Sequence, residues 1–428
     1  MVIQYITIAL MGALASVLSN TGVAVFNDGF RPILPEYLEG RMDRKALAAT
    51  SFAISFGLVI GFGIPVSLTS TIILIHSILL GTDIIGTFCG KGKKGMIIAG
   101  GLGALYGVGL VAGLQFIVDL FSKLPINFLG SLGQVSTPIT IAFAIFPAVA
   151  VALEYGLKKG ILTAGVTLLI RQIVTVFGSF PMGEYTISLN KDGMALLAGM
   201  VFLVVYAVRD KEGAGTTNEQ LVAVFSEKVS RIRKNIPYLA VMGGLVACAT
   251  SLSIVAGDPI SLGLAANGEL GNAAMTALAR AIGFIPLIAT TAITTGVYGP
   301  VGMTFVFVIG FLVRNPIIAL ILGAGIIVLE VLLLTYIAKL LDKFPGVRKC
   351  GDNIRTAMSR VLEIALLIGG MMAAQAIAPG FGLFVIIGMY LLNKFAKKPI
   401  VELAIGPIGA IAVGILVNIL HIIGLYPV

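Results

Sequence analysis

A succession of long apolar stretches, separated by short polar links, limits this chain to one broad class of fold. A helix of about 20 apolar residues crosses the hydrocarbon core of a bilayer. Fourteen such stretches lie at roughly 2–26, 46–68, 69–88, 96–121, 129–156, 160–179, 193–208, 236–256, 270–296, 298–313, 315–339, 356–378, 380–393 and 400–425. We interpret the first as a span and not a signal peptide, because no basic stretch precedes it. We predict an all-α polytopic membrane protein with about 14 transmembrane segments.

Composition agrees with that class and excludes several functions. The 428 residues are 58% hydrophobic and only 11% charged, whereas a soluble domain is about 25% charged. Cys89, Cys248 and Cys350 are far apart, which indicates neither a metal site nor a disulfide framework. No phosphate-binding, zinc-protease or serine-hydrolase motif occurs. We therefore expect no enzyme activity, cofactor, metal or nucleic-acid partner, and membrane lipid as the surroundings.

The lysines and arginines predict the orientation and explain the net charge of +9. Counted over alternate loops from the first, 24 of the 29 basic residues fall on one side of the membrane. Only Lys123, Lys191 and Arg314 fall on the other, and Arg171 and Arg280 lie within spans. Cytoplasmic loops are the ones enriched in Lys and Arg. We therefore expect both termini outside the cytoplasm.

Two short matches point to an internal duplication. L-F-S-K-L-P (120–125) resembles L-L-D-K-F-P (340–345) at an offset of 220. I-G-F-G-I-P (60–65) resembles I-G-F-I-P (282–286) at nearly the same offset and in the same order. Seven spans per half is an odd number, so the second half would enter the membrane from the opposite side, as in inverted repeats.

This duplication predicts the domain organisation. We expect residues 1–208 to form the first repeat, 209–235 a basic cytoplasmic linker and 236–428 the second repeat. At the level of fold only, the plan resembles the nucleobase and anion transporters, in which the third and tenth segments are broken. The short stretches 298–313 and 380–393 are candidates for broken or re-entrant segments. By the same analogy we expect elevator or moving-bundle motion and a homodimer.

The segment 280–300, R-A-I-G-F-I-P-L-I-A-T-T-A-I-T-T-G-V-Y-G-P, is unusually polar for a span. Pro286 is expected to break or kink its helix. Irregular backbone at membrane depth is tolerated where protein or a water-filled cavity satisfies it, so we predict a substrate site here. Its lining would include Thr290, Thr291, Thr294 and Tyr298. The alternative is a kinked packing helix whose threonines bond their own carbonyls.

Ionisable side chains within spans are further site candidates, because they are costly in lipid and mark function. Arg280 needs a carboxylate, carbonyls or an anionic ligand; a structural pair with Glu330 is the alternative to substrate binding. Asp83, beside Thr82 in G-T-D-I-I-G, suits cation coupling or substrate binding, unless it is an interfacial carboxylate near Lys91. We predict that Thr82, Asp83, Arg280 and Glu330 line the substrate site. Coupling to H+ or Na+ would fall to Asp83 or Glu330.

Three neighbouring features bear on the same site. His76 lies two turns before Asp83 on one helix face and is expected to be structural or to relay protons. Asp28 and Arg31, in F-N-D-G-F-R-P-I-L-P-E (26–36), belong to a rigid cytoplasmic turn suited to gating or ligand binding. G-D-N-I-R (351–355) predicts the N-terminal cap of the twelfth helix.

Several motifs together resemble one family. N-D-G-F-R-P-I-L-P-E-Y-L-E-G (27–40), G-T-D-I-I-G (81–86), L-G-S-L-G-Q-V-S-T-P (129–138), P-L-I-A-T-T-A-I-T-T-G-V-Y (286–298) and D-N-I-R-T-A-M (352–358) look like the YhfT family of bacterial inner-membrane proteins. The resemblance runs over essentially the whole chain. It implies a transport protein of the bacterial inner membrane, without an established substrate and without catalytic residues.

These observations lead to a main hypothesis and two alternatives. We expect a secondary active transporter of a small polar or anionic metabolite that works by alternating access. The first alternative is a membrane component, IIC-like, of a sugar phosphotransferase system that needs separate phosphoryl-donor proteins. The second is an intramembrane enzyme or an assembly scaffold, for which no paired catalytic residues are visible.

Overall fold

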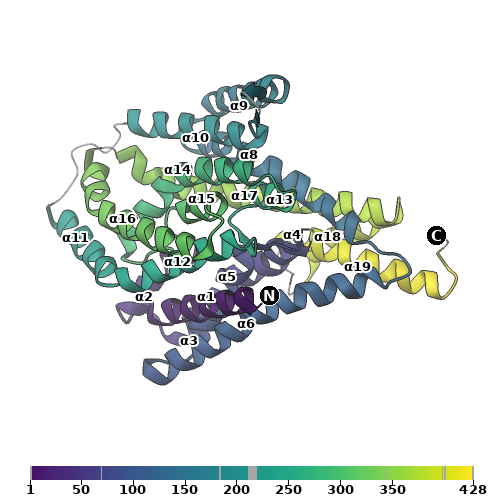
Figure 1. Cartoon of the computed structure of the whole chain (residues 1–428), viewed down its shortest axis with the longest axis horizontal. Helices are drawn as coiled ribbons and strands as arrows, with labels where there is room; N and C mark the ends of the chain where they lie inside the picture. Colours follow the sequence, from purple (N-terminus) through teal and green to yellow (C-terminus); the bar gives the residue numbers. More distant parts are fainter. Residues whose placement is uncertain are drawn as a thin grey trace.

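The structure is a computed structural model that describes residues 2–68, 70–182, 185–210, 219–343, 345–397, 399 and 402–426. It is mostly helical (Figure 1). The first half holds α1 (Val2–Thr21), α2 (Leu34–Leu38), α3 (Arg44–Leu58), the π-helical η1 (Val59–Gly63), α4 (Ile64–Leu68), β1 (Ile73–Leu74), α5 (Ile75–Phe88), α6 (Gly92–Ser122), α7 (Leu129–Leu132), η2 (Gly133–Val135), α8 (Ser136–Tyr155), α9 (Leu157–Phe177), β2 (Ser179–Met182), β3 (Tyr185–Ser188) and α10 (Lys191–Arg209). The second holds α11 (Glu219–Lys234), α12 (Ile236–Ser251), β4 (Val255–Ala256), α13 (Pro259–Ala266), α14 (Leu270–Thr295), α15 (Phe305–Leu312), α16 (Pro316–Lys343), α17 (Pro345–Ile377), α18 (Phe381–Phe395) and α19 (Glu402–Ile422).

The helices confirm a polytopic membrane protein. Among the described residues, ten helical stretches are long and apolar enough to cross a membrane. Three further apolar helices, α5, α12 and α18, have 14, 16 and 15 residues, and α15 has eight. Every predicted apolar stretch is therefore helical over much of its length, but the structure supports about ten candidate spans, and fourteen stays a prediction.

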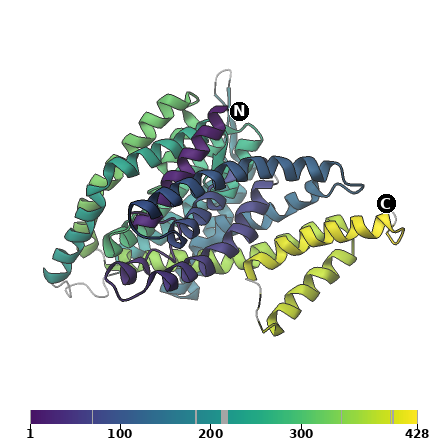
Figure 2. The ribbon, with the colours of Figure 1, turned by 90° about the horizontal axis from the view of Figure 1, so that it is seen from below.

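The spanning helices pack in two groups. The first bundle comprises α1, α3, α4, α5, α6, α12, α14, α15 and α16, with α1 on α6 and α12 on α16. The second bundle comprises α8, α9, α10, α17, α18 and α19, with α8 on α17 at its centre. In Figure 1, α8, α9 and α10 lie along the upper edge and α1, α3 and α6 along the lower edge; α18 and α19 extend to the right in Figures 1 and 2. The bundles meet where α14 packs on α10 and α17, and where η1 packs on α19.

Short extended segments join the two halves of the chain inside the first bundle. Ala24, after α1, forms a parallel bridge with Tyr298, after α14. β1 pairs in parallel with β4, which follows α12. Each segment therefore finds its backbone partner in the other half, and the two pairings are reciprocal. At membrane depth this exchange satisfies N–H and C=O groups that a continuous helix would satisfy internally.

Each of these four segments begins with the same backbone conformation. A residue of positive φ stands two positions before each pairing residue: Gly22 (68°), Thr71 (57°), Ser253 (56°) and Gly296 (70°). This left-handed conformation favours glycine and is strained for threonine and serine. In α14, Gly296 is the residue that ends the helix.

Two local predictions can be compared with the structure. α14 runs unbroken from Leu270 to Thr295 with Pro286 inside it, so Pro286 does not break the helix, and a kink there stays a prediction. The predicted cap at 351–355 is wrong, because α17 already begins at Pro345 and continues through this stretch. There the Asn353 amide donates to Glu154 Oε2 of α8 at 2.8 Å, and Asp352 pairs with Arg355. A polar side chain with a tertiary partner does not need to cap a helix.

Candidate functional site

A cavity of about 430 Å³ lies where the two bundles meet. The first bundle contributes the 26–31 turn, α3, η1, α5, α14 and residues 299–304, whereas the second contributes α17 and Leu403 of α19. The first turn of α5, at His76, and the N-cap of α15, at Thr304, both reach it. Cavities of this size hold small organic molecules.

Arg280 of α14 is one charged residue of the cavity wall, and only 5% of it is exposed. Its Nη1 donates to the carbonyl oxygen of Gly257 at 2.5 Å, and its Nε lies 3.6 Å from Asp258 Oδ2. The guanidinium also stacks on Phe284 and Phe307. Nε and Nη2 have no hydrogen-bond acceptor among the described residues. A buried donor without an acceptor costs about 1–3 kcal/mol. An anionic oxygen that accepted from these two nitrogens would remove that cost. The structure pairs Arg280 with Asp258 and not with Glu330.

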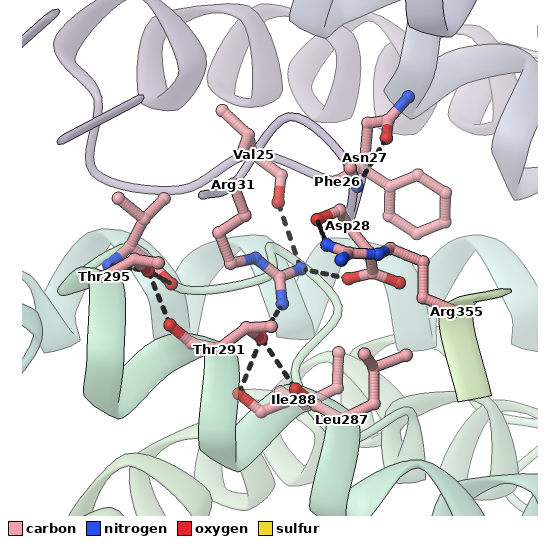
Figure 3. A network of polar contacts seen from close by, with 12 residues as sticks. Val25, Phe26, Asn27, Asp28, Arg31, Leu287, Ile288, Thr291, Thr295 and Arg355 are labelled. Carbon is pink, nitrogen blue, oxygen red and sulfur yellow. Dashed lines mark hydrogen bonds and ion pairs between the residues drawn. The ribbon is translucent and has the colours of Figure 1, made fainter. Parts of the chain in front are cut away.

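Arg31, in the turn of residues 26–31, is a second charged residue of the cavity wall (Figure 3). Its Nη1 donates to Thr291 Oγ1 at 2.6 Å, and its Nη2 lies 2.9 Å from Asp28 Oδ1. The same Nη2 donates to the carbonyl oxygen of Val25 at 3.4 Å. Gly299 packs closely beside this guanidinium, since a Cβ there would lie 3.0 Å from Nη2. The turn and α14 are thereby held together by one arginine.

Asp28 and Arg355 bring the two bundles into contact at the cavity. Arg355 of α17 donates from Nη1 to the Asp28 carbonyl oxygen at 3.4 Å, as Figure 3 shows. Asp28 keeps 31% of its side chain exposed, facing the cavity. The surrounding protein raises the pKa of its carboxyl above the usual value, against the opposing charges of Arg31 and Arg355. This contact would have to break if the bundles separated.

Asp83 lies behind the cavity wall and does not line it. Its Oδ2 accepts hydrogen bonds from the backbone N–H groups of Phe26 and Asn27, both at 2.9 Å. Phe26 and Asn27 themselves line the cavity. Thr82, the preceding residue, donates to the Leu79 carbonyl oxygen within α5. Asp83 therefore holds the turn that presents Asp28 and Arg31.

The other predicted residues also lie outside the lining of the cavity. Thr290, Thr291 and Thr294 donate back to carbonyl oxygens of their own helix, and Thr291 in addition accepts from Arg31. Tyr298 donates to Glu330 Oε2 at 2.7 Å, and the Met303 N–H donates to the same oxygen at 2.8 Å. These hydroxyls and Glu330 thus fix the backbone around the cavity.

Sequence reasoning missed two residues of the site. Asp258 caps α13 by accepting from the Ser261 N–H, and it balances Arg280. An Asp directly before a proline that opens a helix is a cap signature, so G-D-P (257–259) contained the signal. The sequence places Arg355 only in the predicted cap G-D-N-I-R and among the basic residues that predict the orientation. No local pattern places it opposite Asp28, which lies 327 positions away.

Comparisons with known proteins agree on one family. The model of the YhfT family, described as a protein of unknown function, matches residues 4–426. The protein named uncharacterized protein YhfT, from Escherichia coli strain K12, is 36% identical over 442 residues, which cover 99% of this chain and 98% of that protein. No solved structure gives a significant match.

Proposed function

We propose that this chain, which belongs to the YhfT family, is a secondary active transporter of a small anionic metabolite in the bacterial inner membrane. The observation that carries the proposal is the cavity between the two bundles, with Arg280 in its wall. Transporters bind substrate where bundles meet, often at the ends of broken helices. The N-terminal ends of α5 and α15 at the cavity carry positive helix dipoles, which favour an anion.

The reciprocal pairings support two inverted repeats, each of which contributes helices to both bundles. Ala24 and Val255 follow α1 and α12, whereas Ile73 and Tyr298 follow α4 and α14. A duplication would relate α1 to α12 and α4 to α14. It would then map the Ala24–Tyr298 pairing onto the Val255–Ile73 pairing, and the reverse. The packing of α10 on α14 and of α19 on η1 is related in the same way. In this proposal the first bundle carries the substrate and the second stays fixed, as half of a homodimer.

Asp83 is the coupling group we propose, with H+ as the coupling ion. A carboxylate accepts the two N–H bonds of the turn, whereas a protonated carboxyl accepts them more weakly. Protonation of Asp83 would therefore loosen the turn that bears the charged residues Asp28 and Arg31. Glu330 is less suited to this role, because its bonds go to Tyr298 and Met303 and not to the contact between the bundles.

Uptake into proteoliposomes tests the function. Labelled benzenesulfonate, phosphate and citrate stay ionised and cross a bare bilayer slowly, so they serve as probes. At least one should enter liposomes that contain the protein faster than empty liposomes. Arg280→Gln should abolish that uptake, whereas Arg171→Gln should retain it, because Arg171 pairs with Asp192 inside the second bundle and away from the cavity. Wild-type uptake equal to that of empty liposomes for all three would refute the proposal. A phosphorylated product formed only with added donor proteins would instead support the phosphotransferase alternative.

Cysteine labelling tests the proposed orientation. Lys123 ends α6 and Lys158 opens α9, and both are exposed. In intact cells, a membrane-impermeant maleimide should label Lys123→Cys but reach Lys158→Cys only after lysis. The native cysteines Cys89, Cys248 and Cys350 are buried. The opposite pattern would reverse the topology and place the termini in the cytoplasm.

A further inference from the structure

The wall of the cavity is mainly apolar, which is unusual for a site that binds only a small hydrophilic ion. Its apolar side chains come from both bundles, including Ile54 and Leu58 of α3, Leu287 of α14, and Met358 and Leu362 of α17. A phosphate or citrate ion needs many donors around it, and apolar surface offers none. An apolar ligand surface gains about 25 cal/mol per Å² when it is buried against such a wall.

Aromatic rings gather on one part of this wall. His76 meets Phe26 and Phe62 edge to face, with ring centroids 4.9 and 5.1 Å apart. Phe284, which stacks under the Arg280 guanidinium, lines the cavity as well. Rings favour offset or edge-on contact with other rings. A planar, ring-sized body therefore fits the wall better than a compact polar one.

The charged residues at the cavity suit a ligand that carries a single negative charge. Arg31, Arg280 and Arg355 line it together with Asp28. Asp83 and Asp258 lie behind and contact the lining residues. Asp352 also pairs with Arg355, but its side chain is 72% exposed, so water screens its charge. When the other six residues are ionised their formal charges cancel, so one added negative charge can be balanced by one proton on a carboxylate. Two or three added charges would remain largely uncompensated in a buried site, at high cost.

We propose that the ligand of this cavity is an amphipathic organic monoanion: a carboxylate, or an equivalent singly charged group, attached to an apolar body the size of one ring. The inference rests on the proposed function and specifies its substrate class. The anionic group would lie toward Arg280, and the body against the aromatic and aliphatic wall.

Binding to purified full-length protein in detergent tests this ligand class without any transport step. The probes are benzoate, its neutral counterpart benzamide, acetate without the ring, phosphate and citrate, at one pH and one ionic strength. We expect benzoate to bind at least about tenfold more tightly than each of the others, as calorimetric titration would show. Arg280→Gln should lower the affinity for benzoate to the affinity for benzamide. Met358→Gln introduces a polar side chain of similar volume into the apolar wall. It should weaken the binding of benzoate and leave the binding of acetate unchanged.

The outcomes separate the ligand class from the function. Arg171→Gln is the matched control and should bind benzoate as the wild type does. Tightest binding of phosphate or citrate, benzamide equal to benzoate, or no binding by any probe would overturn the ligand class. If phosphate or citrate is nevertheless taken up by proteoliposomes, the transporter proposal stands without this class. If benzoate is preferred but no probe is transported, the class stands and the transporter proposal fails.

Discussion

At the scale of single residues, some buried charged side chains in this protein hold backbone groups and others face the cavity. Asp83 and Glu330 both accept backbone N–H groups from irregular segments. Arg280 and Arg31 instead combine a fixed partner with a place in the cavity wall. A buried charged residue therefore takes one of two structural positions here, and only the structure distinguishes them.

Asp83→Asn should separate substrate exchange from proton-driven uptake. The amide keeps an oxygen that can accept from Phe26 and Asn27, but it cannot take up a proton. We expect exchange of substrate across proteoliposomes to continue, while uptake driven by an inward proton gradient falls to the undriven rate. Asp192→Asn is the control, because Asp192 pairs with Arg171 in the second bundle. Gradient-driven uptake that survives in Asp83→Asn would exclude this residue as the coupling group.

At the scale of elements, the four extended segments share a left-handed start, which is strained in two of them. Ser253 and Thr71 adopt positive φ without being glycine, whereas Gly22 and Gly296 adopt it freely. The strain persists because reciprocal pairing fixes the segments that follow. Sequence alone gave no sign of it, since serine and threonine are rare in this conformation.

Ser253→Gly and Gly22→Ala should shift stability in opposite directions. Relief of the left-handed conformation at Ser253 should stabilise the fold by about 1 kcal/mol, and a Cβ at Gly22 should destabilise it by at least as much. The Cβ at Gly22 would also lie 3.2 Å from a methyl group of Leu38. Apparent melting temperatures of the detergent-solubilised proteins, at one heating rate, provide the measurement. A lower melting temperature for Ser253→Gly would show that its hydroxyl matters more than its φ.

The helices themselves were largely predictable from sequence, and the site only in part. Apolar length located helices over all fourteen stretches, because it reflects the bilayer rather than tertiary detail. Arg280 was found by its cost in lipid, and the 26–31 turn by its Asp28 and Arg31. The threonines of 290–294 illustrate the limit: a hydroxyl in a span can face a cavity or bond its own helix, and local pattern does not decide which.

At the scale of the whole molecule, the proposed alternating access requires the two bundles to move relative to each other. Thr290 of α14 and Gly351 of α17 face one another across the boundary, and a Cβ at Gly351 would lie 2.6 Å from Thr290 Oγ1. A cysteine at each position would therefore bring the two Sγ atoms within reach of a disulfide bond. The boundary can therefore be locked by a covalent link.

Thr290→Cys with Gly351→Cys, in a Cys350→Ser background, should stop transport after oxidation and restore it after reduction. The bond would hold α14 to α17 and prevent alternating access. Thr7→Cys is the matched control: Thr7 Oγ1 lies 3.9 Å from Cys248 Sγ, and α1 and α12 belong to the same bundle. Oxidation of the control should leave uptake unchanged. Full transport by the oxidised double-cysteine protein would mean that this boundary stays rigid.

The reciprocal backbone pairings also govern how the protein can be made. The Val25 N–H donates to the Tyr298 carbonyl oxygen, and the Ile73 N–H donates to that of Ile254. When the two early segments leave the ribosome, their hydrogen-bond partners have therefore not yet been synthesised. At roughly 5–20 residues per second the wait between Val25 and Tyr298 lasts on the order of 15–55 s. Over that time open peptide groups remain exposed near the bilayer interior, where leaving them unpaired is costly. Nascent first halves should therefore depend on insertion factors, and a chain cut before residue 254 would be a substrate for membrane proteases.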